Sequence, residues 1–227
     1  MKNKDVVRFY PGQEIVPFFK NSDICRYCTN ENNHYYILYL GRENTKLKIE
    51  STIYNHLFKF KNILDSRREV KNNVIKFFQL QWSRNESIFK APKIVAPQRS
   101  RVNTFGYNEI DWYAASDVFF ITNTNSKYNL KYILALLNSR LYYFWLLHKG
   151  KKKGNALELT ATPLKEIPIV YVNTDIQNEI IFIVDSILSC IENHTNITEL
   201  ENILNKKIYN IFNITPDEQK IVEQSLK

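Results

Sequence analysis

The stretch that decides the fold is residues 129–150, NLKYILALLNSRLYYFWLLHKG. Asn129 is a residue type that caps the start of a helix, and Gly150 is of the type that ends one. Between them, apolar residues recur at helical spacing on one face: Ile133, Leu134, Leu137, Leu141 and Trp145. This pattern predicts one helix that lies between a strand-rich body and a basic loop.

Upstream of this helix, short runs of β-branched and aromatic residues predict strands. They cover residues 35–40, 93–97, 111–114 and 118–122. The residues up to 19 carry a Pro11-Gly12 turn signal and predict an extended arm with a short strand. Helical spacing predicts a helix over residues 52–64 and a second helical stretch over residues 70–80.

Downstream, residues 174–191 and 197–212 each carry one apolar helical stripe, which predicts an antiparallel helical hairpin. Thr174 with Gln177 forms a capping-box pattern, and residues 215–218 form a second one. We therefore expect an α+β fold with a mixed, mainly antiparallel sheet, flanking helices and a C-terminal helical hairpin. Residues 1–173 would be the α+β body. Residues 174–227 would be a helical tail that packs on it or forms a single domain with it.

The chain carries 31 Lys and Arg against 23 Asp and Glu, a formal charge of +8 and a pI near 9.2. Such a balance indicates an anionic partner such as nucleic acid. AT-rich codon usage also raises Lys content, so the placement of the charges is more informative than their sum. No apolar run approaches the roughly 20 residues of a membrane helix, and no signal peptide is recognisable. We expect a cytoplasmic protein without a membrane partner.

Common catalytic motifs are missing from the sequence: GxGxxG after a strand, a P-loop, HExxH and GxSxG. Cys25 and Cys28 form a CxxC, but no second CxxC follows at zinc-site spacing, so we interpret this pair as structural. The four His are scattered and form no ligand pair. We therefore predict no catalytic residue, no metal and no cofactor in this chain.

A flexible basic loop follows the helix predicted for residues 129–150. Its cationic and polar members are Lys149, Lys151, Lys152, Lys153 and Asn155, framed by two glycines. Because the loop lies between an apolar helix and a strand, a rigid scaffold would hold its ammonium groups against consecutive DNA phosphates. The alternative is a solvated charge run without a partner.

A second polar loop contains Gln98, Arg99, Arg101 and Asn103. Arg and Gln carry planar groups that bind guanine and adenine edges in a bidentate way. We predict that these four residues contribute to base readout. Pairing of the arginines within the protein is the alternative.

Two further residues are candidates for additional DNA contacts. Tyr107 follows the arginine loop, and Arg84 belongs to a polar cluster over residues 79–85. That cluster surrounds Trp82, whose indole we interpret as a core residue.

Several segments together resemble the TaqI-like C-terminal specificity domain, over about residues 15–224. No single motif decides the resemblance, but the order of the segments is specific. They are residues 18–24 with Arg26-Tyr27, then 35–38, 91–95, 113–121, 132–140, the Lys-rich loop, 157–159, 164–169 and 208–218.

This resemblance implies the target-recognition part of an adenine-specific DNA methyltransferase, including those of bifunctional type II restriction-modification enzymes. In such enzymes a separate catalytic domain binds S-adenosylmethionine and carries an Asn-Pro-Pro-Tyr or related motif, and nothing like that motif occurs here. The chain is then no enzyme by itself. Its methyltransferase or endonuclease partner would be joined in cis or be a separate subunit. The Lys-rich loop matches a family feature in position, and residues 99–103 lie where these domains diverge.

The leading hypothesis is therefore sequence-specific recognition of double-stranded DNA as the specificity portion of a type II restriction-modification enzyme. The alternative is a protein-interaction module that docks a partner through the apolar hairpin of residues 176–212. A nuclease with an unrecognised metal site is a third interpretation.

Overall fold

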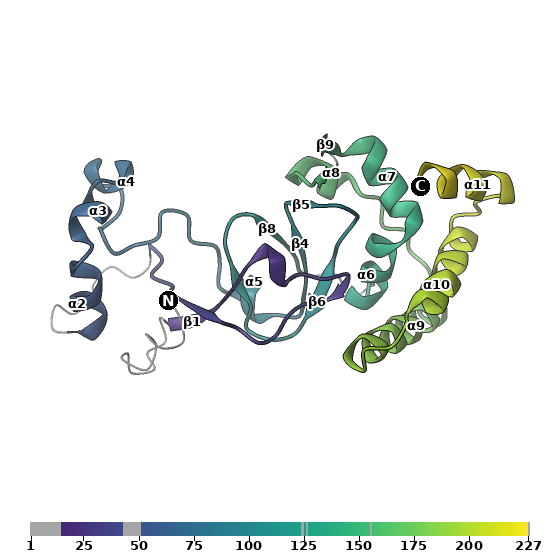
Figure 1. Cartoon of the computed structure of the whole chain (residues 1–227), viewed down its shortest axis with the longest axis horizontal. Helices are drawn as coiled ribbons and strands as arrows, with labels where there is room; N and C mark the ends of the chain where they lie inside the picture. The colour runs from purple at the N-terminus through teal and green to yellow at the C-terminus, as the bar shows by residue number, and fades with distance from the viewer. Residues whose placement is uncertain (1–14, 43–50, 124, 126, 155, 227) are drawn as a thin grey trace. The chain divides into compact units, whose positions relative to one another are not determined.

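The computed structural model of the chain describes residues 15–42, 51–123, 125, 127–154 and 156–226. The chain divides into two compact units. The first contains Met1–Phe19, Asn32–Lys90 and Asp111–Tyr113, and the second contains Lys20–Glu31, Ala91–Ile110 and Ala114–Lys227. The predicted α+β class, with mainly antiparallel sheets and helices towards the C-terminus, is confirmed (Figure 1).

The first unit contains most of a three-stranded sheet in the order β3-β1-β7. Strand β1 (Ile15–Phe19) pairs antiparallel with β3 (Tyr35–Leu38), and β7 (Tyr113–Ala114) lies on the other side of β1. The rings of Phe19 and Trp112 stack with their centroids 4.9 Å apart. Aromatic residues therefore fill the core of this unit. The predicted Pro11-Gly12 turn lies outside the described residues.

Short helices make up most of the remaining first unit. They are α2 (Thr52–Phe58), α3 (Lys61–Asp65), α4 (Arg68–Lys71) and α5 (Ser87–Lys90). The predicted helix over residues 52–64 is present as two helices, because residues 59 and 60 form a turn between α2 and α3.

The predicted helical stretch over residues 70–80 is wrong after Lys71, the last residue of α4. Asn73 adopts a φ of 56°, which ends the helix after α4. The guanidinium of Arg67 then donates to the carbonyl oxygens of Leu64, Phe77 and Gln79. These bonds satisfy main-chain groups in a non-helical conformation, which the apolar spacing of the sequence cannot show.

The second unit contains a four-stranded sheet in the order β2-β6-β4-β8. All five residues of β4 are buried, as expected for a central strand. Gly106 is required in β6, because a Cβ there would lie 2.4 Å from the carbonyl oxygen of Cys28 in the parallel neighbour. The strands are β2 (Tyr27–Cys28), β6 (Gly106–Asn108), β4 (Lys93–Pro97) and β8 (Val118–Ile121).

The apolar stretch of residues 129–150 forms two helices instead of the single one predicted. Helix α6 (Leu130–Asn138) begins at the predicted cap, where Asn129 Oδ1 accepts from the N–H of Lys131. Ser139 then takes an extended conformation with ψ of 159° and caps α7 (Arg140–Lys149). A residue that is extended and capping ends one helix and starts the next, which apolar periodicity does not reveal.

A third sheet, in the order β5-β10-β9, also belongs to the second unit. Its strands are β5 (Arg99–Ser100), β10 (Ala156–Glu158) and β9 (Lys151–Lys153). The shorter helical elements of this unit are η1 (Asn21–Asp23), a 3-10 helix, and α8 (Ala161–Glu166).

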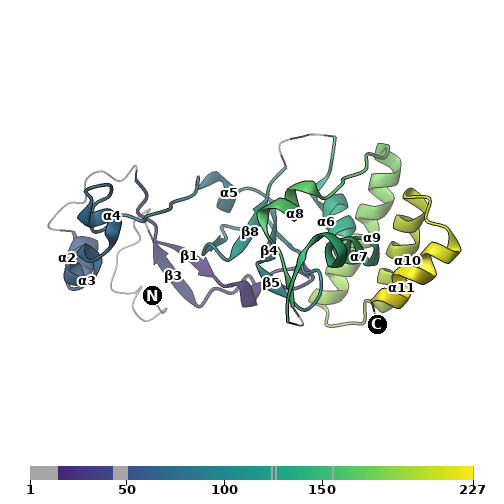
Figure 2. The same cartoon turned by 90° about the horizontal axis from the view of Figure 1, so that it is seen from above.

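The predicted C-terminal hairpin is confirmed, as α9 (Thr174–Glu192) and α10 (Thr198–Ile211), followed by α11 (Pro216–Ser225) (Figures 1 and 2). The cap of α9 is Asn173 and not the predicted Thr174–Gln177 box. Gln177 instead donates to the carbonyl oxygens of Lys127 and Val172. The capping box at the start of α11 is present as predicted.

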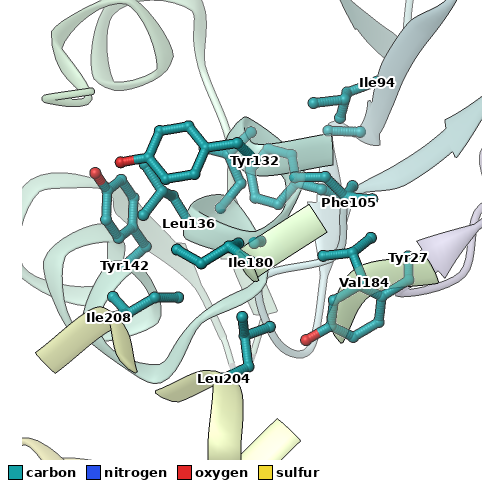
Figure 3. Packing of buried hydrophobic residues seen from close by; sticks show 14 of the residues in the cluster. Tyr27, Ile94, Phe105, Tyr132, Leu136, Tyr142, Ile180, Val184, Leu204 and Ile208 are labelled. Atoms are coloured by element: carbon teal, nitrogen blue, oxygen red, sulfur yellow. The ribbon is translucent and has the colours of Figure 1, made fainter. Parts of the chain in front are cut away.

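The hairpin supplies one side of the main hydrophobic core (Figure 3). Ile180, Val184, Leu204 and Ile208 are fully buried there, against Tyr132 and other residues of α6 and α7. This packing uses most of the apolar stripe on which the protein-interaction alternative rested. Residue 173, at the end of the predicted α+β body, lies inside the second unit, which includes Ala114–Lys227.

Candidate nucleic-acid interface

The structure joins the two predicted loops into one sheet, β5-β10-β9, which we call the basic sheet. Glu158 on the middle strand faces Arg99 on one side and Lys151 on the other. Directly opposed residues of antiparallel strands lie on the same face, so these three form a row across the sheet. Arg99 donates through Nε and Nη2 to Glu158 Oε1, at 2.9 and 2.8 Å. Lys151, the second cation of the row, thus lies opposite a carboxylate that is already paired with an arginine.

The cationic end of this sheet adjoins the C-terminus of α7. Lys149 is the last residue of the helix and Lys151 the first of β9, and both are exposed. The C-terminal end of a helix carries partial negative charge, which favours cations at this place. The main chains of Lys152 and Lys153 pair with β10, and the predicted phosphate contact Asn155 lies outside the described residues.

The β-hairpin of β9 and β10 is anchored in the core on its other side. Leu157 and Leu159 are buried, as is Leu146 of α7. The N–H of Gly150 donates to the carbonyl oxygen of Leu146 at 2.7 Å and closes the helix. The exposed lysines therefore stand on a rigid base, as a phosphate-binding surface requires.

The two glycines on either side of β9 differ in the space available for an added Cβ atom. At Gly150 a Cβ would lie 2.4 Å from the Leu146 carbonyl oxygen, whereas at Gly154, with φ of 63°, it would meet nothing within 4 Å. We expect Gly150→Ala to lower the free energy of unfolding by about 2–3 kcal/mol, because backbone must move. Gly154→Ala should cost only about 1 kcal/mol, the strain of a left-handed alanine. Urea denaturation of both variants measures the difference, and equal losses would contradict the close approach.

The arginine strand is held through its main chain. The N–H of Gln98 donates to Asp117 O and its carbonyl accepts from Leu159, both at 2.8 Å. The hydroxyl of Tyr143 in α7 donates to the carbonyl oxygen of Arg101 at 3.1 Å. The side chain of Gln98 is half-buried and Arg101 is exposed. Backbone contacts fix this segment and leave the guanidinium of Arg101 at the surface.

Asn103 occupies a different environment from the other three predicted base-reading residues. It is 1% exposed, and its Nδ2 donates to the carbonyl oxygens of Leu137 and Ser139, at 2.6 and 3.0 Å. Its Oδ1 accepts from Arg26 at 3.1 Å. The amide is bound within the protein, so it has no group left for a base edge in this conformation.

This amide belongs to a polar cluster that the sequence analysis missed. Arg26 also donates to the carbonyl oxygen of Asn138 and to Glu201 of α10, at 2.8 and 2.6 Å. Asn138 in turn bonds both the N–H and the carbonyl of Phe105. The cluster joins the segment after β5 to the α6–α7 junction and to α10. Its signal in the sequence is the polar trio of residues 138–140, which interrupts an otherwise apolar stretch.

The two additional candidates lie outside the basic sheet. Tyr107 is in β6, where its hydroxyl donates to Glu109 and the ammonium of Lys131 lies 5.6 Å from its ring centroid. Burial and this carboxylate raise the pKa of its phenol, so it stays protonated. Arg84 belongs to the first unit. Their contacts to DNA stay predictions.

Within the CxxC, the thiol of Cys28 is held in its protonated form. Burial, with a smaller contribution from Cys25, raises the pKa of the Cys28 thiol to about 11. A thiol with such a pKa is protonated at neutral pH, whereas nucleophilic attack uses the thiolate. No group of three or more His, Cys, Asp or Glu that could hold a metal occurs in the described part of the chain.

A family model for the TaqI-like C-terminal specificity domain matches residues 16–169. The chain belongs to this family. The resemblance inferred from the sequence is confirmed over these residues, and the likeness of residues 208–218 lies beyond the match. The basic sheet of this specificity domain, residues 99–158, is inside the matched range.

Curated relatives of the specificity domain are type II methyltransferases. It is 28% identical over 147 residues to M.HincII of Haemophilus influenzae, which is 60% of this chain and 29% of that protein. It is 26% identical over 167 residues to M.MjaIV of Methanocaldococcus jannaschii, covering 71% of this chain and 55% of that protein. The chain thus spans less than a third of the length of M.HincII and about half of the length of M.MjaIV.

A solved structure shares the fold of the specificity domain. It is the type IIL restriction-modification enzyme MmeI in complex with DNA, with a TM-score of 0.66 and 12% identity. The match covers 94% of this chain and 30% of MmeI. The shared architecture therefore includes both units and the C-terminal helices.

Proposed function

We propose that this specificity domain binds double-stranded DNA by sequence, as the target-recognition part of a type II restriction-modification enzyme. The observation that supports this most is the basic sheet together with the adjoining end of α7, where Lys149, Lys151 and Arg99 are exposed on a rigid base. Lys149, Lys151, Lys152 and Lys153 contact phosphates, with Asn155 beside them, and Gln98, Arg99 and Arg101 contact base edges. Asn103 is left out, because its amide is buried.

The chemistry belongs to a partner in this proposal. An adenine-specific methyltransferase domain, with or without an endonuclease, binds S-adenosylmethionine, extrudes the target adenine and modifies it. That domain is joined in cis or is a separate subunit, and the present chain presents the DNA to it. No helix in the described residues has the length and hydrophobicity to cross a membrane.

Titration of the chain with a labelled random-sequence duplex tests the proposal directly. The logarithm of the association constant should fall linearly with the logarithm of the salt concentration, as phosphate contacts require. Selection from a randomised duplex library should then enrich one motif. If no duplex binds at low salt, the proposed function is wrong.

Replacing Arg101 with Ala should change the enriched motif and not only weaken binding. A bidentate arginine contact discriminates one base pair by about 1–3 kcal/mol, so preference at one position should fall by about 5- to 150-fold. Arg99→Ala should have the smaller effect, because Glu158 already holds that guanidinium. The same selection measures both, with Lys165→Ala on α8 as control. Equal weakening on all sequences would contradict base readout by Arg101.

A further inference from the structure

Trp82 is exposed, although the sequence suggested a core position. Its exposed fraction is 78%, whereas that of Trp112 in the same unit is 0%. Its chain neighbours are Gln81 and Ser83, so polar side chains flank the indole. Single apolar side chains are common at protein surfaces, so the neighbours of this ring decide what it does.

The loop that carries Trp82 is held at both ends. The N–H of Leu80 donates to the carbonyl oxygen of Leu40 at 2.7 Å. The hydroxyl of Tyr39 accepts from the N–H of Arg84 at 2.7 Å and donates to its carbonyl at 2.8 Å. Tyr39 is itself buried and packs edge-on against Phe89. The exposed ring is therefore presented by a fixed loop.

A guanidinium lies next to the indole. The central carbon of Arg42 is 5.7 Å from the Trp82 ring centroid, and its Nη2 donates weakly to Gln81 O at 3.4 Å. Gln79 fixes the backbone of Arg42, since its Nε2 donates to the Arg42 carbonyl oxygen at 3.2 Å. An indole with an adjacent guanidinium offers both a stacking surface and a positive charge.

The charge of this unit suits a nucleic acid. In its described residues, the acidic side chains are fewer than the basic ones. The acidic ones are Asp65, Glu69, Glu86 and Asp111, and the basic ones are Arg42, Lys59, Lys61, Arg67, Arg68, Lys71, Lys76, Arg84 and Lys90. A protein-docking anchor is usually surrounded by further apolar groups, which the flanking Gln81 and Ser83 do not supply.

We propose that Trp82 and Arg42 form a stacking platform for one unstacked nucleobase of the bound DNA. This inference rests on the proposed function, because a methyltransferase that extrudes its target base into its own active site leaves the opposite base without its pairing partner. The indole stacks on the base, and Arg42 lies near its phosphate. The platform accepts any base, because every base has a π-face.

The test compares two short duplexes of the same random sequence, one fully paired and one with a single extrahelical base. Fluorescence anisotropy measures the dissociation constant of each. The wild-type chain should prefer the extrahelical duplex, and Trp82→Ala should lower that preference by about 5- to 150-fold. Trp82→Phe, which keeps an aromatic face, should retain most of it. Phe182→Ala, at a 74% exposed ring on α9, is the matched control and should change nothing.

The outcomes separate this inference from the proposed function. If the wild-type chain binds neither duplex, the proposed function fails. If it binds both and Trp82→Ala leaves their ratio unchanged, the stacking platform is wrong while DNA binding stands. Circular dichroism verifies that each variant is folded.

Discussion

Replacing the four lysines around β9 with alanine should reduce the salt dependence of DNA binding more than any other change to this chain. Each lysine that contacts a phosphate releases a counterion, which contributes about 0.9 to the slope of log K against log salt. Four lost contacts should therefore lower the slope by about 3 to 4. The substitutions are at Lys149, Lys151, Lys152 and Lys153, and the slope is measured by anisotropy over a series of salt concentrations.

A charge-matched variant separates this local effect from the loss of net charge. Four lysines on helices α8, α10 and α11 can be replaced together, at Lys165, Lys206, Lys207 and Lys220. Both variants lose the same formal charge, but only the first removes the cationic end of the basic sheet. Equal slopes in the two variants would show that the overall charge, and not this sheet, binds the phosphates.

Replacing Asn103 with Leu should destabilise the fold by about 3 kcal/mol. Leu has nearly the same shape but leaves the Leu137 and Ser139 carbonyls without this donor and removes an acceptor from Arg26. Each buried polar group that loses its partner costs about 1–3 kcal/mol. Urea denaturation, followed by circular dichroism, measures the change in the free energy of unfolding.

The same variant decides between the two roles of Asn103. As a base reader, its replacement would leave stability intact and alter the selected DNA motif. As a member of the buried cluster, its replacement lowers stability and leaves the motif unchanged wherever the protein is folded. Asn178→Leu, at an exposed position of α9, is the control and should change stability by less than about 0.5 kcal/mol.

Much of the fold follows from local patterns in the sequence. The strands near residues 35–38, 93–97 and 118–121 and the hairpin of α9 and α10 were predictable, because periodicity reports which face is buried. The failures share one cause. At Ser139, at residues 72–80 and at Gln177, polar groups bond across long sequence distances or against the local pattern, and no periodicity records such bonds.

The candidate site was predictable in its residues but not in its geometry. Clusters of Lys and Arg are visible in the sequence, whereas the pairing of β5 with β10 joins residues 99 and 158 and depends on tertiary structure. The burial of Asn103 and the exposure of Trp82 were also hidden, since Asn and Trp occur both in cores and at surfaces. The residue types in the sequence indicate candidate DNA contacts, and the packing of the folded chain determines which of these side chains face solvent.

The way in which residues 98–103 are fixed has a consequence for how new DNA specificities arise. The anchors are main-chain bonds at Gln98 and Arg101 and one buried side chain at Asn103. None of these anchors depends on which side chains stand at positions 99 and 101. We expect a library randomised at these two positions to yield mostly folded proteins that differ in the motif they select. Such a segment can drift in sequence without losing the scaffold that holds it.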